Sequence, residues 1–279
     1  MAKFITPLRY PGGKSRVAKE LVGYFPSFST YREPFIGGGS VFLETKSTMP
    51  EKTYWINDLN QNLISFWAKT KNDLDNLVNE ITSLKIQFTN DGRGLYKHLR
   101  NGYAPDDDML KIATRFFILN RITFSGLTDS GGYSEESFKK RFTDSSLEKL
   151  LFSSKLLQEV KITNLDYSSL LSEVGQDVFI FLDPPYFSQK NSKLYGENGD
   201  LHTQFKHDAF AEEVLNCKHK WMITYDDSPY IRDLFQGHYI YDWDIQYGMG
   251  SKRGSLKKGK ELIITNYKID NFRNEKISS

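Results

Sequence analysis

Short apolar runs and amphipathic stretches alternate along most of the chain. The clearest apolar run is Val178–Leu182, whose β-branched and aromatic residues predict a strand that is buried on both faces. Further strands are predicted at residues 31–36, 53–58, 160–163, 221–225, 238–247 and 260–268. Helices are predicted at residues 15–25, 59–71, 72–88, 108–126, 206–217 and 229–235. This alternation is typical of an α/β protein.

Residues 89–159 differ in composition from the segments on either side, because polar and glycine-rich loops surround one long helical stretch. We predict that they form a small inserted helical domain, and that residues 1–88 and 160–279 form the main domain. Basic and aromatic residues at loop tips suit contact with a nucleic-acid backbone and wedging between bases, although an ordinary solvated surface has the same composition. The candidates for DNA contact are Arg93, Arg121, Phe124, Tyr133 and Lys139.

The composition of the chain mainly excludes certain kinds of site and of protein. The net charge of +2 does not by itself indicate a nucleic-acid-binding protein. A single cysteine, Cys217, excludes an internal disulfide and a cysteine-rich zinc site, and the spacing of the five histidines predicts no metal site. No stretch is apolar enough to span a membrane and the N-terminus lacks a signal peptide, so we expect a cytoplasmic protein.

Two polar loops are predicted beside the functional site. Residues 248–259 join the last two predicted strands and carry the strongest local cluster of positive charge, at Lys252, Arg253, Lys257 and Lys258. We expect this loop to contact phosphates, with a disordered solubilising loop as the alternative. Residues 189–203 form a long polar loop suited to closing over a substrate.

The buried run Val178–Leu182 ends at the tetrapeptide Asp-Pro-Pro-Tyr. Proline cannot donate to a sheet, so the strand stops and leaves Asp183 at its carboxyl end. The Asp183 carboxylate and the Pro184 carbonyl can each accept a hydrogen bond from an amino group on a nucleobase, and the Tyr186 ring can stack on that base. These residues are the predicted catalytic group; the alternative is a proline-terminated strand with an aspartate cap.

A second group of residues is typical of a nucleotide site. Glycines at residues 37–39 follow a predicted strand, and Asp58 follows Gly39 by 19 positions, the spacing of an acid that binds ribose hydroxyls. Asp58 could instead cap the next helix. Asp166 ends another strand and could accept from an adenine amino group or cap a turn. Gly13 and Lys14 do not belong to a P-loop, because that motif requires glycine at the position of Leu8. Lys14 is therefore either positioned by a simple glycine turn or solvated at the start of a helix.

Taken in order, the segments RYPGGK, YREPFIGGGSVF, NDLN, NLDY and FLDPPYF resemble the DNA adenine methylase type of N6-adenine methyltransferase over residues 6–268. The resemblance implies S-adenosylmethionine as methyl donor, no metal, and a Rossmann-like sheet whose last strand is antiparallel. It implies that the residues that bind S-adenosylmethionine (AdoMet) are Tyr10, Lys14, Phe35, Gly37, Gly39, Asp58, Asp166 and Asp183. Ser125 stands where the family frequently has asparagine, so no recognition sequence is inferred.

We therefore expect a site-specific enzyme that methylates N6 of an adenine flipped out of double-stranded DNA. Methylation of cytosine N4 uses the same amino chemistry, but the first residue of the tetrapeptide, Asp183, and the motif order favour adenine. Protein glutamine methylation uses a related tetrapeptide that normally begins with asparagine. A binding-only subunit that holds DNA or AdoMet is the alternative from another class. The resemblance also allows a cognate restriction endonuclease as a functional partner.

Overall fold

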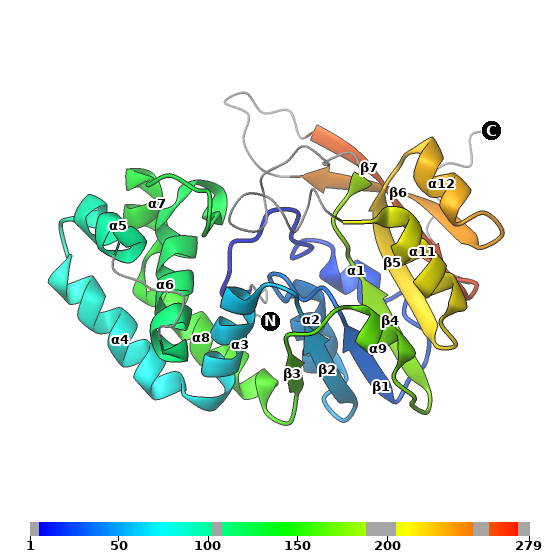
Figure 1. Ribbon diagram of the computed structural model, residues 1–279, viewed down its shortest axis with the longest axis horizontal. Coiled ribbons are helices and arrows are strands. Elements are labelled where there is room, and N and C mark those ends of the chain that lie inside the picture. The colour runs from blue at the N-terminus through cyan, green and yellow to red at the C-terminus, as the bar shows by residue number, and fades with distance from the viewer. Residues whose placement is uncertain (1–5, 102–107, 188–204, 248–256, 273–279) are drawn as a thin grey trace.

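The described residues form one seven-stranded sheet, around which the helices are arranged (Figure 1). The computed structural model describes residues 6–101, 108–187, 205–247 and 257–272. The strands are β1 (Thr30–Glu33), β2 (Thr53–Asn57), β3 (Lys161–Thr163), β4 (Val178–Leu182), β5 (Lys220–Asp226), β6 (Tyr239–Tyr247) and β7 (Lys257–Thr265). Their order is β3-β2-β1-β4-β5-β7-β6, and β7 runs antiparallel to both of its neighbours. The predicted α/β fold with an antiparallel last strand is confirmed.

Helices connect the strands and also form a group of their own. They are α1 (Ala18–Val22), α2 (Ser40–Thr48), α3 (Gln61–Asn72), α4 (Leu74–Gln87), α5 (Gly92–Asn101), α6 (Met109–Ile122), α7 (Glu135–Arg141), α8 (Asp144–Leu157), α9 (Ser168–Ser172), α11 (His207–Asn216) and α12 (Pro229–Leu234). The first helix is shorter than predicted, and α6 ends at Ile122 rather than near residue 126. Across the described ranges, no helix is both long enough and apolar enough to cross a membrane.

The side chains of β4 divide the core into two layers, because successive residues of a strand point to opposite faces. Phe179 and Phe181 belong to the cluster that α1, α2 and α3 cover. Ile180 and Leu182 belong to the cluster that α9, α11 and α12 cover. All of β4 is buried, as its apolar sequence predicts. Helices therefore cover both faces of the sheet. The carboxyl ends of the strands are the natural place for a ligand in such a fold.

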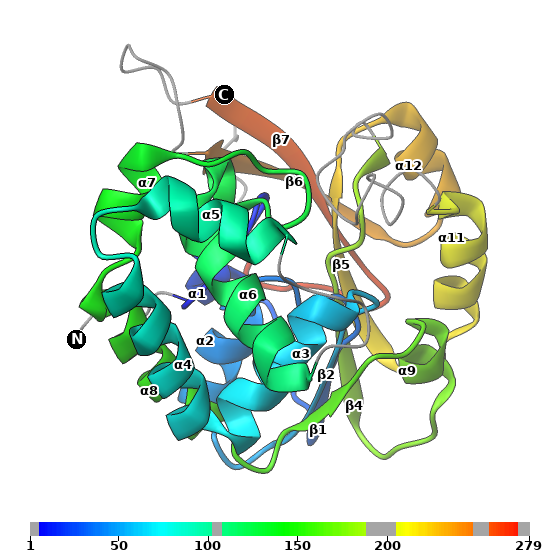
Figure 2. The same cartoon turned by 60° about the vertical axis from the view of Figure 1, so that its left-hand side comes forward.

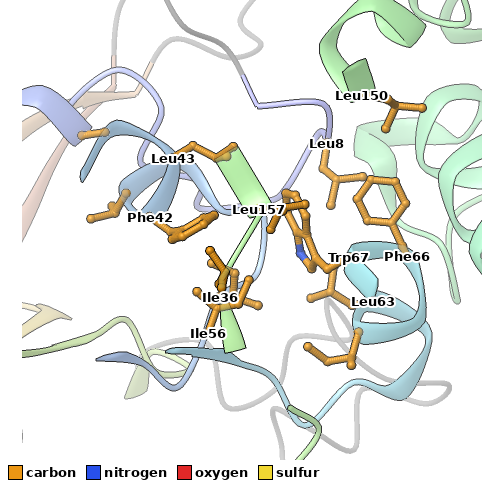
Figure 3. Close-up of a cluster of buried hydrophobic side chains, with 14 of the residues drawn as sticks. Leu8, Ile36, Phe42, Leu43, Ile56, Leu63, Phe66, Trp67, Leu150 and Leu157 are labelled. Atoms are coloured by element: carbon orange, nitrogen blue, oxygen red, sulfur yellow. The ribbon is translucent and has the colours of Figure 1, made fainter. Parts of the chain in front are cut away.

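Helices α4 to α8 lie on one side of the molecule, with α3 between them and the sheet (Figures 1 and 2). Phe66 of α3 stacks on Phe117 of α6, with ring centroids 5.9 Å apart and planes 7° apart. Figure 3 shows Phe66 and Trp67 in the same buried cluster as Ile56 of β2 and Leu157 of α8. Apolar packing is therefore continuous from the sheet into residues 89–159, and the proposed division into two domains stays a prediction.

Phe117→Ala should lower the free energy of unfolding by about 3–5 kcal/mol, because it removes a fully buried ring from this continuous core. Denaturant unfolding measures the change. Ile86→Ala is the control, because Ile86 is 70% exposed and its truncation should alter stability by about 0.5 kcal/mol or less. A Phe117 effect as small as that of the control would mean that α6 does not pack on α3 in solution.

Candidate active site

A cavity of about 850 Å³ opens at the carboxyl ends of the central strands. The chain proceeds from β1 outward through β2 to β3, then returns to β4 on the other side of β1, so the cavity lies at the point where the strand order reverses. Every residue predicted for catalysis or cofactor binding lines it, namely Tyr10, Lys14, Phe35, Gly37, Gly39, Asp58, Asp166, Asp183, Pro184 and Tyr186. Their individual roles remain predictions.

Asp183 follows β4 directly and accepts three hydrogen bonds from Lys14 and Thr224. Lys14 Nζ lies 2.8 Å from Oδ1 and 2.9 Å from Oδ2, and Thr224 of β5 donates to Oδ1 at 2.6 Å. The Asp183 side chain keeps 24% of its surface exposed, toward the cavity that it lines. Among the described residues its oxygen Oδ2 accepts from Lys14 only, so it retains a lone pair for a ligand amino group.

Lys14 is not a solvated lysine, because its side chain is only 4% exposed. Besides Asp183, its ammonium lies 2.9 Å from Tyr186 Oη, 3.3 Å from the Gly12 carbonyl oxygen and 3.9 Å from Glu261 Oε2. Two carboxylates and one cation therefore share a nearly buried space. The sequence predicted Lys14 as a cofactor contact, whereas the structure brings its charge to the predicted catalytic carboxylate.

Glu261, near the middle of β7, is a site residue that the sequence analysis did not identify. It is 3% exposed, lines the cavity, and its Oε2 accepts from Tyr186 Oη at 2.8 Å. Burial raises the pKa of Glu261 to about 7, against the opposing effect of Lys14. Its Oε1 has no hydrogen-bond partner among the described residues. The only signal in the sequence was an acid directly before the apolar run Leu262–Ile264.

The glycine loop after β1 packs against two aromatic rings. Gly37 and Gly39 have φ angles of 45° and 69°, which glycine adopts without strain. A Cβ at Gly37 would lie 2.9 Å from the ring of Tyr10, and one at Gly39 would lie 2.8 Å from that of Trp67. Trp67 also donates through Nε1 to the Gly37 carbonyl oxygen at 3.2 Å. The lack of side chains at these glycines lets both rings pack directly against the backbone of the loop, which lines the cavity.

Asp58 fixes the same loop from β2. Its two oxygens accept from the backbone N–H groups of Gly37 and Asn60, each at 3.0 Å, and burial raises its pKa to about 6. Asn60, not Asp58, caps α3, since its side chain accepts from Leu63 N–H at 3.2 Å, so the capping alternative for Asp58 is wrong.

Asp166 lines the cavity and also holds a turn, because its Oδ1 accepts from the Ser168 N–H at 3.0 Å and from the Ser168 hydroxyl at 2.6 Å. Phe35 contributes a ring that stacks on Tyr167, with centroids 5.6 Å apart.

Among the candidates for DNA contact, Phe124 is 71% exposed in a single helical turn after α6. The Arg93 guanidinium lies 5.4 Å from the centre of the Tyr133 ring, and Lys139 forms an exposed ion pair with Glu135 at 3.0 Å. Ser125, next to Phe124, has a φ of 56°, a left-handed conformation that asparagine adopts more readily than serine. These residues present an exposed aromatic and exposed charges.

Arg121 differs from the other candidates because it is only 5% exposed. Its Nε donates to the Arg141 carbonyl oxygen at 2.9 Å and its NH1 group to the Pro7 carbonyl oxygen at 3.1 Å. Burial lowers its pKa to about 10. Because the Arg121 guanidinium is buried and donates to two backbone carbonyl oxygens, it is not placed to contact DNA. Arg121 instead holds the N-terminal segment against α6.

The basic loop and the closing loop fall largely outside the described residues. Lys252 and Arg253 are not described, and neither is the segment 189–203. Lys257 and Lys258 were predicted in the loop but begin β7, where they pair with Tyr247 and Gln246 of β6. The strand is longer than predicted because the sheet continues through polar residues that no apolar pattern marks.

The family of the chain follows from comparison with known proteins. A model of D12 class N6 adenine-specific DNA methyltransferases matches residues 10–249. This chain belongs to that family. The Type II methyltransferase M.MjaIII of Methanocaldococcus jannaschii is 28% identical over 199 residues, which cover 64% of this chain and 68% of that protein. The DNA adenine methylase of Vibrio cholerae is 27% identical over 241 residues, which cover 82% of this chain and 84% of that protein.

The family predicted from the order of the motifs is therefore confirmed. Among solved structures, a precorrin-6y C5,15-methyltransferase from Geobacter metallireducens GS-15 has a TM-score of 0.39 and 9% identity, and covers 91% of this chain and 88% of that chain. The described residues form no group of three or more histidine, cysteine, aspartate and glutamate side chains that could hold a metal ion.

The buried acid makes stability depend on pH. Because the pKa of Glu261 is raised from 4.5 to about 7, the unfolded chain ionises this group at a lower pH than the folded protein does. The resulting cost to stability is absent at low pH, grows as pH rises between these values and is complete above about 7. Glu261→Gln should therefore stabilise the protein at pH 8 by up to about 3 kcal/mol, and far less at pH 5.

Thermal unfolding of both proteins at the two pH values measures this difference. Glu212→Gln, the same change at an exposed position of α11, should leave the melting temperature unaltered at both. A Glu261→Gln effect that is equal at pH 5 and pH 8 would contradict the raised pKa.

Proposed function

We propose that the protein transfers the methyl group of S-adenosylmethionine to N6 of an adenine turned out of double-stranded DNA. The observation that carries this proposal is the anchored Asp183 carboxylate, whose Oδ2 has room for a further donor at the wall of the cavity. The adjoining Pro184, whose carbonyl would be the second acceptor, lies in the same wall. Membership of an adenine-specific DNA methyltransferase family supports the assignment of Asp183 and Pro184 as acceptors for the adenine amino group.

The residues of the cavity fit the cofactor. The glycine loop lines the cavity with its backbone, and the half-buried Asp58 just after β2 suits the ribose hydroxyls. Phe35 and Asp166 would hold the adenine of the cofactor, while Tyr10 and Gly39 border the same space. When bound, S-adenosylmethionine supplies a methyl group that is already activated by its attachment to a positively charged sulfur.

The task of the protein is then to orient the substrate nitrogen. Hydrogen bonds from the amino group to Asp183 Oδ2 and to the Pro184 carbonyl would direct the nitrogen lone pair toward the methyl group and stabilise the positive charge that develops on nitrogen. The half-buried Tyr186 ring would stack on the flipped base. Alignment of two bound reactants accounts for most of the rate that such a site must supply.

Residues 89–159 would then recognise DNA. The exposed ring of Phe124 suits insertion between bases, and Arg93, Tyr133 and Lys139 offer contacts to the backbone. The basic segment 248–259 would add phosphate contacts, including those of Lys252, Arg253, Lys257 and Lys258. The matched Type II methyltransferase is compatible with a cognate restriction endonuclease as a functional partner.

Incubation of the protein with labelled S-adenosylmethionine and unmethylated genomic DNA, followed by mass spectrometry of the nucleosides, tests the proposal. We expect N6-methyldeoxyadenosine from the wild type and none from Asp183→Ala, because the variant lacks the acceptor that orients the amino group. The circular dichroism spectrum of the variant should match that of the wild type. N4-methyldeoxycytidine would reassign the substrate base, and near-normal turnover by Asp183→Ala would refute the mechanism.

Phe124→Ala should slow base flipping, because the variant loses the exposed ring that would fill the space of the displaced base. The fluorescence of 2-aminopurine, placed at the target position mapped from methylated DNA, measures flipping directly. Leu215→Ala, which removes a 40% exposed side chain from α11, serves as the control and should flip normally. An equal fluorescence rise with Phe124→Ala would remove Phe124 from the DNA interface.

A further inference from the structure

Methylation of an amino group leaves a proton that has to be removed. Formation of the bond between N6 and the methyl carbon breaks the bond between that carbon and the donor sulfur, which takes the bonding electron pair and becomes neutral. The nitrogen then has four bonds and a positive charge until one N–H proton leaves. A proton acceptor near the site therefore assists the reaction, and most strongly when the proton begins to leave during the attack.

The oxygens of Asp183 already accept three hydrogen bonds from Lys14 and Thr224. A second acceptor within reach of Asp183 would allow the released proton to leave its carboxyl group before the next turnover.

Glu261 is that second carboxylate. It is 3% exposed and lines the same cavity, yet its Oε1 has no partner among the described residues. The Tyr186 hydroxyl connects the two acids, because its oxygen lies 3.3 Å from Asp183 Oδ1 and 2.8 Å from Glu261 Oε2. Lys14 Nζ lies 2.9 Å from that hydroxyl, so the connection is fixed by a buried cation.

We propose that Glu261 is the final acceptor of the proton released by the substrate amino group, which reaches it through Asp183 and the Tyr186 hydroxyl. The inference rests on the proposed function and adds a residue to its mechanism. Asp183 takes the proton from N6 on Oδ2, and its carboxyl group then turns about the Cβ–Cγ bond so that this oxygen faces Tyr186. It gives the proton to Tyr186 Oη as the tyrosine gives its own proton to Glu261 Oε2. Asp183 and Tyr186 end unchanged, Glu261 ends neutral, and it returns the proton to solvent after the product leaves.

The surroundings of Glu261 agree with this role. The groups that face it are Lys14 from the N-terminal segment, Asp183 and Tyr186 after β4, and Asp226 on β5. On β6 its register partner is the uncharged Trp243, which donates to Glu20 beyond it at 3.1 Å. Burial and the two aspartates raise the pKa of Glu261 while Lys14 lowers it, and the resulting value of about 7 suits a base that works near neutral pH.

Single-turnover rates of DNA methylation, measured from pH 5.5 to 9 with saturating S-adenosylmethionine, test the inference. The wild-type rate should rise as Glu261 ionises and level off above its pKa. Glu261→Gln keeps the shape of the side chain and an acceptor for Tyr186 but takes up no proton. Its rate at pH 8 should be lower by about 100-fold, the lower end for general-base catalysis, and should not rise through pH 7.

Two further variants separate this role from a structural one. Tyr186→Phe keeps the ring but breaks the connection, so it should lose the same rise in rate. Glu212→Gln should keep the wild-type profile. Calorimetry should give S-adenosylmethionine the same affinity for Glu261→Gln as for the wild type.

The inference is overturned if Glu261→Gln keeps the wild-type rate and pH profile, or if its deficit lies entirely in cofactor affinity. A wild-type protein that forms no N6-methyldeoxyadenosine at any pH would instead refute the proposed function itself.

Discussion

The rest of the site depends on one nearly buried ion pair, between Lys14 and Asp183. It joins segments 169 residues apart, at 2.8 Å, and brings Glu261 of β7 within 3.9 Å of the same ammonium. Removing such charges from water is costly, and the cost is offset only when every partner is well placed. Here the cation lies among two carboxylates and the Tyr186 hydroxyl. The N-terminal segment, the end of β4 and the middle of β7 are thereby fixed to one another.

The sheet supplies the position of this pair. β4 is buried on both faces, and the prolines that follow end it at the point where the strand order reverses. The glycine loop after β1 reaches the same edge, where Asp58 and Trp67 hold its backbone. The groups proposed for catalysis and for cofactor binding meet because neighbouring parallel strands end together.

The N-terminal segment also connects the cavity to the helices proposed to contact DNA. The Asn120 side chain of α6 accepts from Arg9 N–H at 2.9 Å and donates to the Arg9 carbonyl oxygen at 2.7 Å. It donates as well to the Gly126 carbonyl oxygen at 3.0 Å, beside the exposed Phe124. Tyr10 follows Arg9 directly in the chain, and Lys14 lies five residues after Arg9. A shift of the Phe124 turn would therefore also displace the N-terminal segment, whose Lys14 anchors Asp183.

The sequence by itself determined the strands, the glycine turn, the acids at strand ends and the family, because apolar runs, prolines and glycines act over a few neighbouring residues. It did not determine that Lys14 pairs with Asp183, that Glu261 joins them, or that Arg121 is buried on the Pro7 carbonyl. No local pattern encodes these contacts, which exist only once distant segments are packed together. Which acid is buried, and hence which can take up a proton near neutral pH, was decided by the tertiary structure alone.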